Sequence, residues 1–348
     1  MVHRNIPIFI PHLGCPNQCV FCNQRSISGC HSFREADVPL LIEQALATIP
    51  DGSETEIAFF GGSFTGIDRG LMIRLLETAE SYVRAGRVKS IRLSTRPDYI
   101  SEEILEILSR YSVRTVELGL QSMDDGVLEA STRGHTAKQA ETACRAVVAA
   151  GFALVGQMMV GLPTSTLESE IATAERICQL GASAARIYPT VVFYDTPLCD
   201  LTQAGRYLPL SVEEAVARAA SVLEIFAAHG IPCIRIGLCA TEELISPQTA
   251  MAGPNHAALG ELVWNEYYYR TLVRALTREG LCGKDVVLYV PEKEISKVVG
   301  QHRKNLVRLA DETGTVVHRI VKEKNADRIR VVLWQGDGRV AGGKQPCI

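Results

Sequence analysis

Three cysteines near the N-terminus have the spacing C-x3-C-x2-C, and they are Cys15, Cys19 and Cys22. One loop can therefore carry three thiolates to a single metal centre. Thiolates are soft ligands that select zinc or iron–sulfur clusters. A structural zinc site needs a fourth ligand, which Cys30, His31 or His12 would have to supply. A cubane cluster held by three cysteines instead leaves one iron open to an external ligand, as a catalytic cluster requires.

The other eight cysteines are scattered singly along the chain. The total of eleven is odd, and the N-terminal residues show neither a charged-then-apolar leader nor a cleavage site of small residues. A disulfide framework is therefore not expected. We expect a cytoplasmic protein in which most cysteines are small, buried, apolar side chains.

The composition is typical of a folded globular protein, because 47% of the 348 residues are hydrophobic and 22% are charged. This length predicts one large or two modest domains. No apolar run approaches the ~18 residues that a membrane span requires, so we expect no membrane partner. Residues 284–348 carry 13 Lys and Arg against 8 Asp and Glu, whereas the remainder carries 23 against 31. A basic part on an acidic body indicates a separate role for that part, with a polyanion as a candidate partner.

Short apolar stretches rich in β-branched residues alternate with segments of helical spacing. The expected strands are 6–12, 56–60, 90–95, 115–120, 153–160, 184–193 and 231–238. The expected helices are 38–49, 71–85, 101–111, 136–150, 167–180 and 212–228, and two of them begin with capping boxes, Thr136 with Gln139 and Ser211 with Glu214. This alternation predicts an α/β fold, a partial (β/α)6-type barrel with helices outside a parallel sheet. In such barrels the chemistry lies in the loops after the strands, and the cysteine loop follows the first strand.

The pattern changes after residue 283. Residues 286–290 predict a strand, 292–299 and 304–310 two short helices, and 315–321 and 328–334 two more strands. We therefore expect a barrel with its C-terminal extension over residues 1–283 and a small, basic α+β module over 284–335. Residues 336–348 are rich in Gly and polar residues and predict a flexible tail.

The cysteine spacing, with the aromatic Phe21 before the third cysteine, resembles the radical S-adenosylmethionine (SAM) superfamily. Within it, the chain resembles the catalytic subunit of the Elongator complex and its bacterial relatives, with coproporphyrinogen-dehydrogenase-like proteins next. The motifs that carry this resemblance lie at residues 15–23, 94–98, 119–122, 133–136, 158–163 and 186–190. They span roughly residues 6–240 and are more specific as an ordered set than any one of them alone.

The resemblance implies a [4Fe–4S] cluster on the three clustered cysteines and SAM as the second cofactor. The residues it implies for SAM binding are Gly61, Gly62, Ser63, Ser94, Gln121, Arg133 and Gln157. Gly61 and Gly62 follow the second strand, where glycine allows a backbone to approach a ligand closely. Ser94 stands where both sets of relatives carry Glu, so the ribose contact expected there is weakened or replaced.

Four further residues have two interpretations each. Arg235 lies within an apolar stretch, so if buried it must be paired, and a carboxylate or a phosphate would suit it. His135 is a helix-entry residue beside Thr136 or a catalytic base. Tyr188 and Tyr194, at the end of the sixth strand, face the substrate or pack in the core.

Residues 300–303, between the two short C-terminal helices, resemble the G-x-x-G loop with which KH domains clamp a nucleic-acid backbone. The second glycine is replaced by Arg303, whose charge suits phosphate. The RNA-binding residues expected in this KH-like module are Lys297, Arg303, Lys304 and Arg308. The alternative is a packing domain whose basic face is only solvated.

These features predict a radical SAM enzyme that cleaves SAM and generates a deoxyadenosyl radical, with RNA, and tRNA in particular, as its substrate. The resemblance further implies an electron donor such as flavodoxin or ferredoxin. It also implies an acyl-group-supplying partner, since residues 284–348 are too few for the Elongator acetyltransferase domain. One alternative is a tetrapyrrole-related radical SAM enzyme or haem-handling protein, although that branch carries a fourth cysteine where this chain has Gln24. Another is a non-catalytic, metal-bearing RNA-binding protein.

Overall fold

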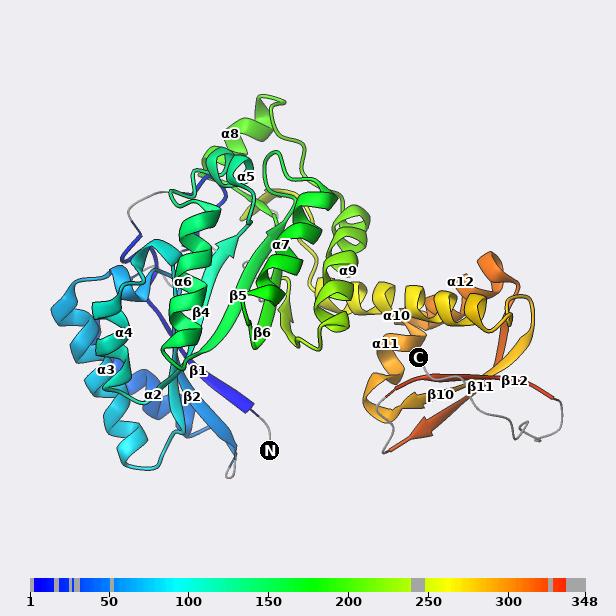
Figure 1. The fold of residues 1–348 in the computed structure, drawn as a ribbon, viewed down its shortest axis with the longest axis horizontal. Helices are drawn as coiled ribbons and strands as arrows, with labels where there is room; N and C mark the ends of the chain where they lie inside the picture. The colour runs from blue at the N-terminus through cyan, green and yellow to red at the C-terminus, as the bar shows by residue number, and fades with distance from the viewer. Residues whose placement is uncertain are drawn as a thin grey trace. The chain divides into compact units, whose positions relative to one another are not determined.

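The computed structural model describes residues 3–15, 19–24, 27, 32–50, 53–238, 248–324 and 328–335. The chain divides into two compact units (Figure 1). The first contains Met1–Arg218 and Ile225–Ala257, and the second contains Ala219–Glu224 and Ala258–Ile348. The predicted tail and two of the three candidate zinc ligands, Cys30 and His31, lie outside the described residues.

The first unit is built on a parallel sheet whose described strands follow the order β1-β2-β3-β4-β5-β6-β8. Their bounds are β1 His3–Phe9, β2 Glu54–Phe60, β3 Ser90–Thr95, β4 Val113–Gln121, β5 Ala153–Val160, β6 Ala184–Pro189 and β8 Cys233–Ile236. Each neighbour in the sheet is the next strand of this series along the chain, as expected when a helix returns the chain after every strand. The predicted partial β/α barrel is confirmed.

The helices that connect these strands lie on the outer side of the sheet (Figure 1). The longer ones are α2 Val38–Leu46, α3 Arg69–Arg84, α4 Glu102–Ser109, α6 Ala137–Ala149, α7 Leu167–Gln179 and α9 Val212–Ala228. Both predicted capping boxes form, at the start of α6 and of α9. Shorter helices, α5 Asp125–Ala130 and α8 Pro197–Gln203, lie in the loops after β4 and β6.

The stretch predicted as one strand over 184–193 is two strands. Strand β6 ends at Pro189, and β7 (Val192–Phe193) pairs with β9 (Ala250–Ala252) in a separate antiparallel sheet. Proline has no N–H to continue a ladder, which explains the break.

The two faces of the first sheet differ in chemistry because side chains alternate along each strand. Ile6 and Ile8 of β1, Ile57 and Phe59 of β2 and Leu93 of β3 are fully buried. The residues that alternate with them line a cavity, and many are polar or charged. The sheet therefore buries one apolar face and presents a polar one to the cavity.

The second unit is an α+β module. Helix α10 (Leu259–Arg278) is followed by β10 (Asp285–Pro291), α11 (Ile295–Val299), α12 (Lys304–Thr313), β11 (Val316–Glu323) and β12 (Arg330–Leu333). Strand β10 is central, parallel to β11 and antiparallel to β12. The predicted β-α-α-β-β order is confirmed over the described residues.

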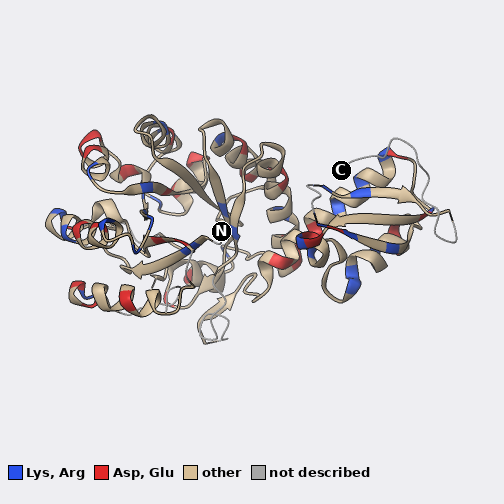
Figure 2. Cartoon of the chain, turned by 90° about the horizontal axis from the view of Figure 1, so that it is seen from below, with Lys and Arg blue, Asp and Glu red and all other residues tan. Residues whose placement is uncertain are grey.

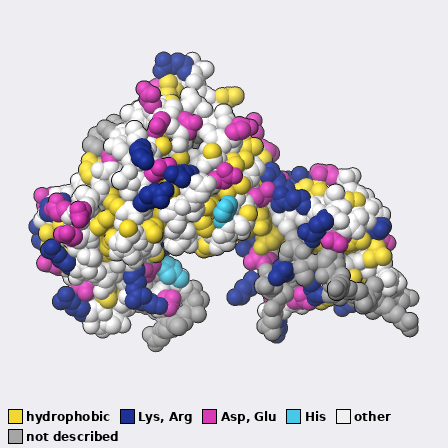
Figure 3. Space-filling view, viewed as in Figure 1, with side chains coloured by type: hydrophobic (Ala, Val, Ile, Leu, Met, Phe, Trp, Pro, Cys, Tyr) yellow, Lys and Arg dark blue, Asp and Glu magenta, His cyan; other side chains and the backbone are white. Residues whose placement is uncertain are grey.

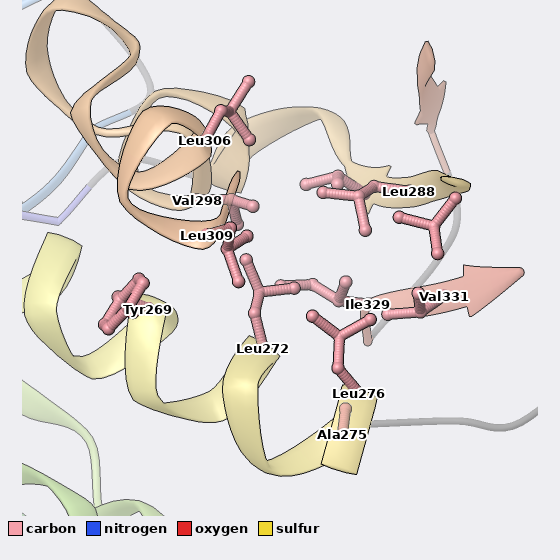
Figure 4. Packing of buried hydrophobic residues seen from close by; sticks show 12 residues of the cluster. Tyr269, Leu272, Ala275, Leu276, Leu288, Val298, Leu306, Leu309, Ile329 and Val331 are labelled. Atoms are coloured by element: carbon pink, nitrogen blue, oxygen red, sulfur yellow. The ribbon is translucent and has the colours of Figure 1, made fainter. Parts of the chain in front are cut away.

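Helix α10 belongs to this second unit, whose longer segment, Ala258–Ile348, also includes the predicted module. Tyr269, Leu272 and Leu276 lie on one helical face and pack against Leu288 and Leu309 (Figure 4). The small sheet thus buries its apolar face under α10, α11 and α12. Among the described residues, no helix is long and apolar enough to span a membrane.

Candidate active site

A cavity of about 500 Å³ lies on the polar face of the first sheet. Its lining includes nine of the residues that the sequence singled out for cofactors: Cys15, Cys19, Cys22, Gly61, Gly62, Ser94, Gln121, Arg133 and Gln157. Pockets of this size typically hold one small ligand. The folding of five different strands and their loops brings these residues to one place.

Ser63 is the predicted site residue that is not among the described residues lining the cavity. Its side chain is fully buried, and its Oγ lies 2.8 Å from the Oγ1 of Thr95. The Oγ also accepts a hydrogen bond from the N–H of Arg96. This side chain therefore ties the loop after β2 to the end of β3.

The cysteine loop is held by the protein around it. The N–H of Val20 donates to the carbonyl of Ser131 over 3.2 Å. Val20 and Phe21 are buried in an apolar cluster with Val127 and Leu198. Burying these two side chains between the cysteines fixes the loop without occupying the thiols.

Two glycines let this loop interlock with the loop after β2. A Cβ on Gly62 would lie 2.3 Å from the carbonyl oxygen of Leu13 and 2.5 Å from that of Ile10. A Cβ on Gly14 would lie 2.2 Å from the carbonyl oxygen of Ser63. The close approach that Gly62 allows is thus to the protein's own backbone, whereas we had expected an approach to a ligand. Gly61, with φ of +94°, has no protein atom closer than 3.4 Å to its Cβ position.

Two buried arginines face the cysteines. Arg133 donates from Nη1 to the Sγ of Cys19 over 3.4 Å and from Nη2 to the carbonyl of Gly119 over 2.6 Å. Arg96 donates from Nη2 to the carbonyl of Arg133 over 2.6 Å. Burial raises the pKa of the Cys15 thiol, and the positive charges of Arg133 and Arg96 lower it. Burial has the larger effect, so the pKa of this thiol is raised, and the two cations partly offset the cost of forming the thiolate that binds metal.

The donor set fits an iron–sulfur cluster better than a single ion. Among the described residues, no group of three His, Cys, Asp or Glu side chains could hold one metal ion. The ligands of a [4Fe–4S] cluster bind different irons, so their thiols stand further apart. His12, the described candidate for a zinc ligand, accepts a hydrogen bond at Nε2 from the N–H of Gln24 over 3.0 Å. Gln24 in turn donates from Nε2 to the Sγ of Cys22 over 3.5 Å.

Two glutamines predicted to contact SAM form a closed amide pair. Gln121 donates to Gln157 over 2.9 Å, and Gln157 donates back over 2.8 Å. Gln121 has a left-handed backbone with φ of 67°, at an irregularity in the pairing of β4 with β5. Ser94 lines the same cavity and lies beside Glu117 in the register of β3 and β4.

A group of charged side chains on β2, β3, β4 and β6 was not predicted from the sequence. Arg92 lies 3.7 Å from Glu56 and 3.5 Å from Glu117, and Arg186 lies 3.1 Å from Glu117. Burial raises the pKa of Glu117, and Arg186 and then Arg92 lower it. The available signal was a charged residue inside each apolar strand, because a buried charge requires a partner.

The remaining candidates separate clearly. Tyr188 lines the cavity, whereas Tyr194 is 39% exposed and is not among the described lining residues. His135 is buried and also absent from that lining. Burial lowers the pKa of His135 to about 3, and the charge of Arg133 adds to this effect. This imidazole is therefore neutral near pH 7.

The KH-like loop of the second unit has an unusual backbone. Gly300, His302 and Arg303 have φ of 76°, 51° and 61°. Left-handed backbone at two consecutive non-glycine residues is strained. Asn305 is buried and donates to the carbonyls of Asn265 and Val298, which fixes the start of α12 beside this loop.

The four basic residues predicted for RNA differ in availability. Arg303 and Lys304 are exposed and have no ion-pair partner among the described residues. Lys297 pairs with Glu294 over 3.2 Å and lies over the ring of Trp264. In Figure 2, Lys and Arg positions are coloured blue on several elements of this unit.

Arg308 is held more tightly than the other three. It pairs with Glu266 over 2.6 Å and with Glu312 over 2.9 Å, and its guanidinium lies 3.7 Å from the ring centre of Tyr269. A phosphate would have to break these contacts.

The face of the first unit drawn in Figure 3 mixes acidic and basic side chains.

Residues 9–177 match the family model of the radical SAM superfamily, and residues 182–269 match that of the radical SAM C-terminal domain. An uncharacterized protein of Methanocaldococcus jannaschii is 27% identical over 232 residues, which are 63% of this chain and 70% of the relative. Human Elongator complex protein 3 is 31% identical over 138 residues, which are 39% of this chain and 25% of that protein.

A tRNA uridine(34) acetyltransferase of Methanocaldococcus jannaschii is 29% identical over 146 residues, which are 41% of this chain and 26% of that protein. The chain thus spans about a quarter of the length of these Elongator-type relatives. Among solved structures, the archaeal Elongator protein of Methanocaldococcus infernus with an N-terminal deletion has the same fold. Its TM-score is 0.59 at 19% identity, and the match covers 82% of this chain and 66% of that one.

Proposed function

Because the chain belongs to the radical SAM superfamily, we propose that it is an enzyme that modifies RNA, with tRNA as the substrate class. The superfamily uses a [4Fe–4S] cluster together with SAM. The observation that carries the proposal is the single cavity lined by the three cysteines, the glycine pair and Arg133.

We assign the cluster to Cys15, Cys19 and Cys22. When bound by these cysteines, the cluster would supply the electron for reductive cleavage of SAM, and SAM would supply the radical chemistry for removing hydrogen from the substrate. The protein contributes orientation and charge: Arg133 donates to a cysteine sulfur and Gln24 to another, and such contacts tune a metal site.

We assign SAM to the part of the cavity between the cysteine loop and the glutamine pair. Gly61 supports this assignment, because it lines the cavity with a φ of +94°, a backbone conformation that favours glycine. Arg133 would neutralise a ligand carboxylate there, because its guanidinium is buried and its Nε has no hydrogen-bond partner among the described residues.

Two observations support tRNA as the substrate class. The Elongator-type relatives include a protein named for its action on tRNA. The second unit carries the KH-like loop, in which Arg303 and Lys304 are exposed. A cavity of about 500 Å³ has room for part of a nucleotide beside SAM and not for a duplex, so the target nucleotide would leave its stack before reacting.

The proposal is tested with the full chain, purified anaerobically, reconstituted with iron and sulfide, and incubated with SAM and dithionite. We expect deoxyadenosine to form, and a new modified nucleoside to appear when bulk tRNA is digested and analysed by mass spectrometry. Cys15→Ala should lose the iron–sulfur chromophore, whereas Cys282→Ala, which changes an exposed cysteine, should keep it. Deoxyadenosine without any change in tRNA nucleosides would refute tRNA as the substrate.

A further inference from the structure

Arg235 is a cation in the cavity wall that the assignments above leave unused. It belongs to β8, the last strand of the sheet, and it lines the cavity. Its Nε donates to the carbonyl of Gly237 over 3.1 Å. Among the described residues, no carboxylate lies within ion-pair distance of its guanidinium.

The neighbours of Arg235 make this arrangement costly for the protein alone. Arg186 is its register partner on β6, so two guanidinium groups start from adjacent positions on the same face of the sheet. Like charges placed opposite one another in a sheet are destabilising. The carboxylates nearby are already engaged: Glu117 by Arg186 and Arg92, and Glu56 by Arg92.

Glu56 makes further contacts. Its two carboxylate oxygens each lie 2.7 Å from a partner, the Nε2 of His3 and the Oγ of Ser90. Arg235 acts on Glu117 only at longer range, where its charge helps to lower the pKa of that carboxyl after Arg186 and Arg92. Among the described residues, the one direct hydrogen bond of the Arg235 guanidinium is therefore to a backbone carbonyl.

Arg186 is fixed in place beside it. Its guanidinium contacts Glu117, lies 5.1 Å from the ring centre of Phe60, and donates from Nη1 to the hydroxyl of Tyr188 over 3.1 Å. A guanidinium held in this way is preorganised to receive a ligand. Tyr188 and both arginines line the same cavity as the cysteines.

We propose that Arg235, Arg186 and Tyr188 form a subsite for an oxyanion of the substrate, either a phosphoryl or a carboxylate group. This inference rests on the proposed function, since it assigns substrate to the same cavity. An anion would compensate the charge of Arg235 and separate the two guanidinium groups electrostatically. Guanidinium forks match both phosphate and carboxylate oxygens, and the tyrosine hydroxyl can donate one more hydrogen bond.

The test uses the anaerobically purified full chain with its cluster and with saturating SAM, which occupies the arginines near the cysteines. Phenylglyoxal modifies arginines, and mass spectrometry of peptides measures the modification of Arg235. The probe is inorganic phosphate, compared with sodium acetate and with sodium chloride at the same ionic strength. We expect phosphate or acetate to slow the modification of Arg235 at least fivefold relative to chloride. The better of the two identifies the oxyanion.

Calorimetry gives a second readout. Arg235→Gln should weaken binding of the protecting anion about tenfold or more, because a hydrogen bond to a charged group contributes about 1.5–3 kcal/mol. Arg235→Lys should recover part of that affinity. Arg206→Gln removes the same charge from an exposed position and should bind the anion like the unchanged protein.

Equal modification of Arg235 in phosphate, acetate and chloride would overturn the subsite. So would unchanged anion affinity in Arg235→Gln, provided that its thermal unfolding matches that of Arg206→Gln. If Arg235→Gln unfolds early, the protection experiment on the unchanged protein still decides. Neither readout requires RNA. The anion subsite can therefore be supported even if tRNA is not the substrate, and it can fail even if tRNA is the substrate.

Discussion

The guanidinium of Arg133 donates to the sulfur of Cys19 across 3.4 Å, although 114 positions separate the two residues in the chain. The contact forms because α5 is followed by a tight turn in which Thr132 has a left-handed backbone with φ of 51°. The same turn accepts a hydrogen bond at Ser131 from the cysteine loop. A single turn therefore anchors the loop and brings a buried cation to its sulfur.

Replacing Arg133 should separate SAM binding from cluster binding. Arg133→Leu should retain the iron–sulfur chromophore, because the thiols remain, and should lose at least about tenfold in SAM affinity, since a charged hydrogen bond is removed. Calorimetry with SAM on the reconstituted protein measures this. The SAM affinity of Arg133→Lys should lie between that of the unchanged protein and that of Arg133→Leu. An unchanged dissociation constant in Arg133→Leu would remove this residue from the SAM site.

Replacing Gly62 should disturb the cysteine loop itself, and any effect on ligand binding should be secondary. Gly62→Ala would place a Cβ 2.3 Å from the carbonyl oxygen of Leu13, so the loop that leads to Cys15 must shift. We expect about 1–3 kcal/mol less stability from this overpacking, together with reduced iron content after reconstitution.

Gly86→Ala is the matched control for Gly62→Ala. Unlike Gly62, Gly86 has a positive φ, 70°, and no atom lies within 4 Å of the added Cβ. It should lose only the roughly 1–2 kcal/mol of a left-handed alanine and should keep its iron. Equal iron contents in the two variants would contradict the interlock between the two loops.

His135 should make stability depend on pH. Burial lowers its pKa to about 3 in the folded protein, whereas the unfolded chain has the ordinary value near 6.5. Below pH 6.5 the unfolded chain binds a proton that the folded protein does not, so the free energy of unfolding falls as the pH falls. Between pH 7.5 and 5.5 this residue should account for about 1.4 kcal/mol of the loss.

His135→Gln should remove that part of the pH dependence. Urea unfolding of both proteins at the two pH values measures it as a difference of differences, so any general loss of stability in the variant cancels. The same pH dependence in both proteins would mean that the folded protein admits the proton.

RNA affinity should depend on the two exposed cations of the KH-like loop. Arg303→Glu combined with Lys304→Glu should weaken tRNA binding and reduce the slope of log affinity against log salt by roughly 1.4, at about 0.7 per lost phosphate contact. Arg110→Glu with Arg145→Glu changes the same charge on exposed positions of the first unit and is the control.

A variant of Arg308 is a second comparison within the same unit. This residue is already paired with Glu266 and Glu312. Arg308→Gln should therefore mainly lower the free energy of unfolding, and it should change the slope of log affinity against log salt little. Filter binding at several salt concentrations measures the salt slope of the loop double variant and that of Arg308→Gln. If the double variant of the loop binds tRNA as the unchanged protein does, the module is not the RNA-binding part.

Most helices, most strands and the cysteine loop could be predicted from the sequence because they depend on residues close together in the chain. A capping box joins Thr136 to Gln139, three positions away, and the cluster motif extends over only eight residues. Motif order along the strands was enough to identify the parallel barrel, since its neighbours in space are neighbours in sequence.

Contacts between distant segments were decided only by the tertiary structure. The sequence could not show that Gly62 abuts Leu13, that Arg308 is paired with Glu266, or that α10 packs with the C-terminal module. It marked Arg235 as a cation that would need a partner if buried, but its position opposite Arg186 follows from the register of β6 and β8. Register and the packing of loops depend on the whole fold, because a buried charge is stabilised only by groups within a few ångströms, and the fold brings those groups from far along the chain.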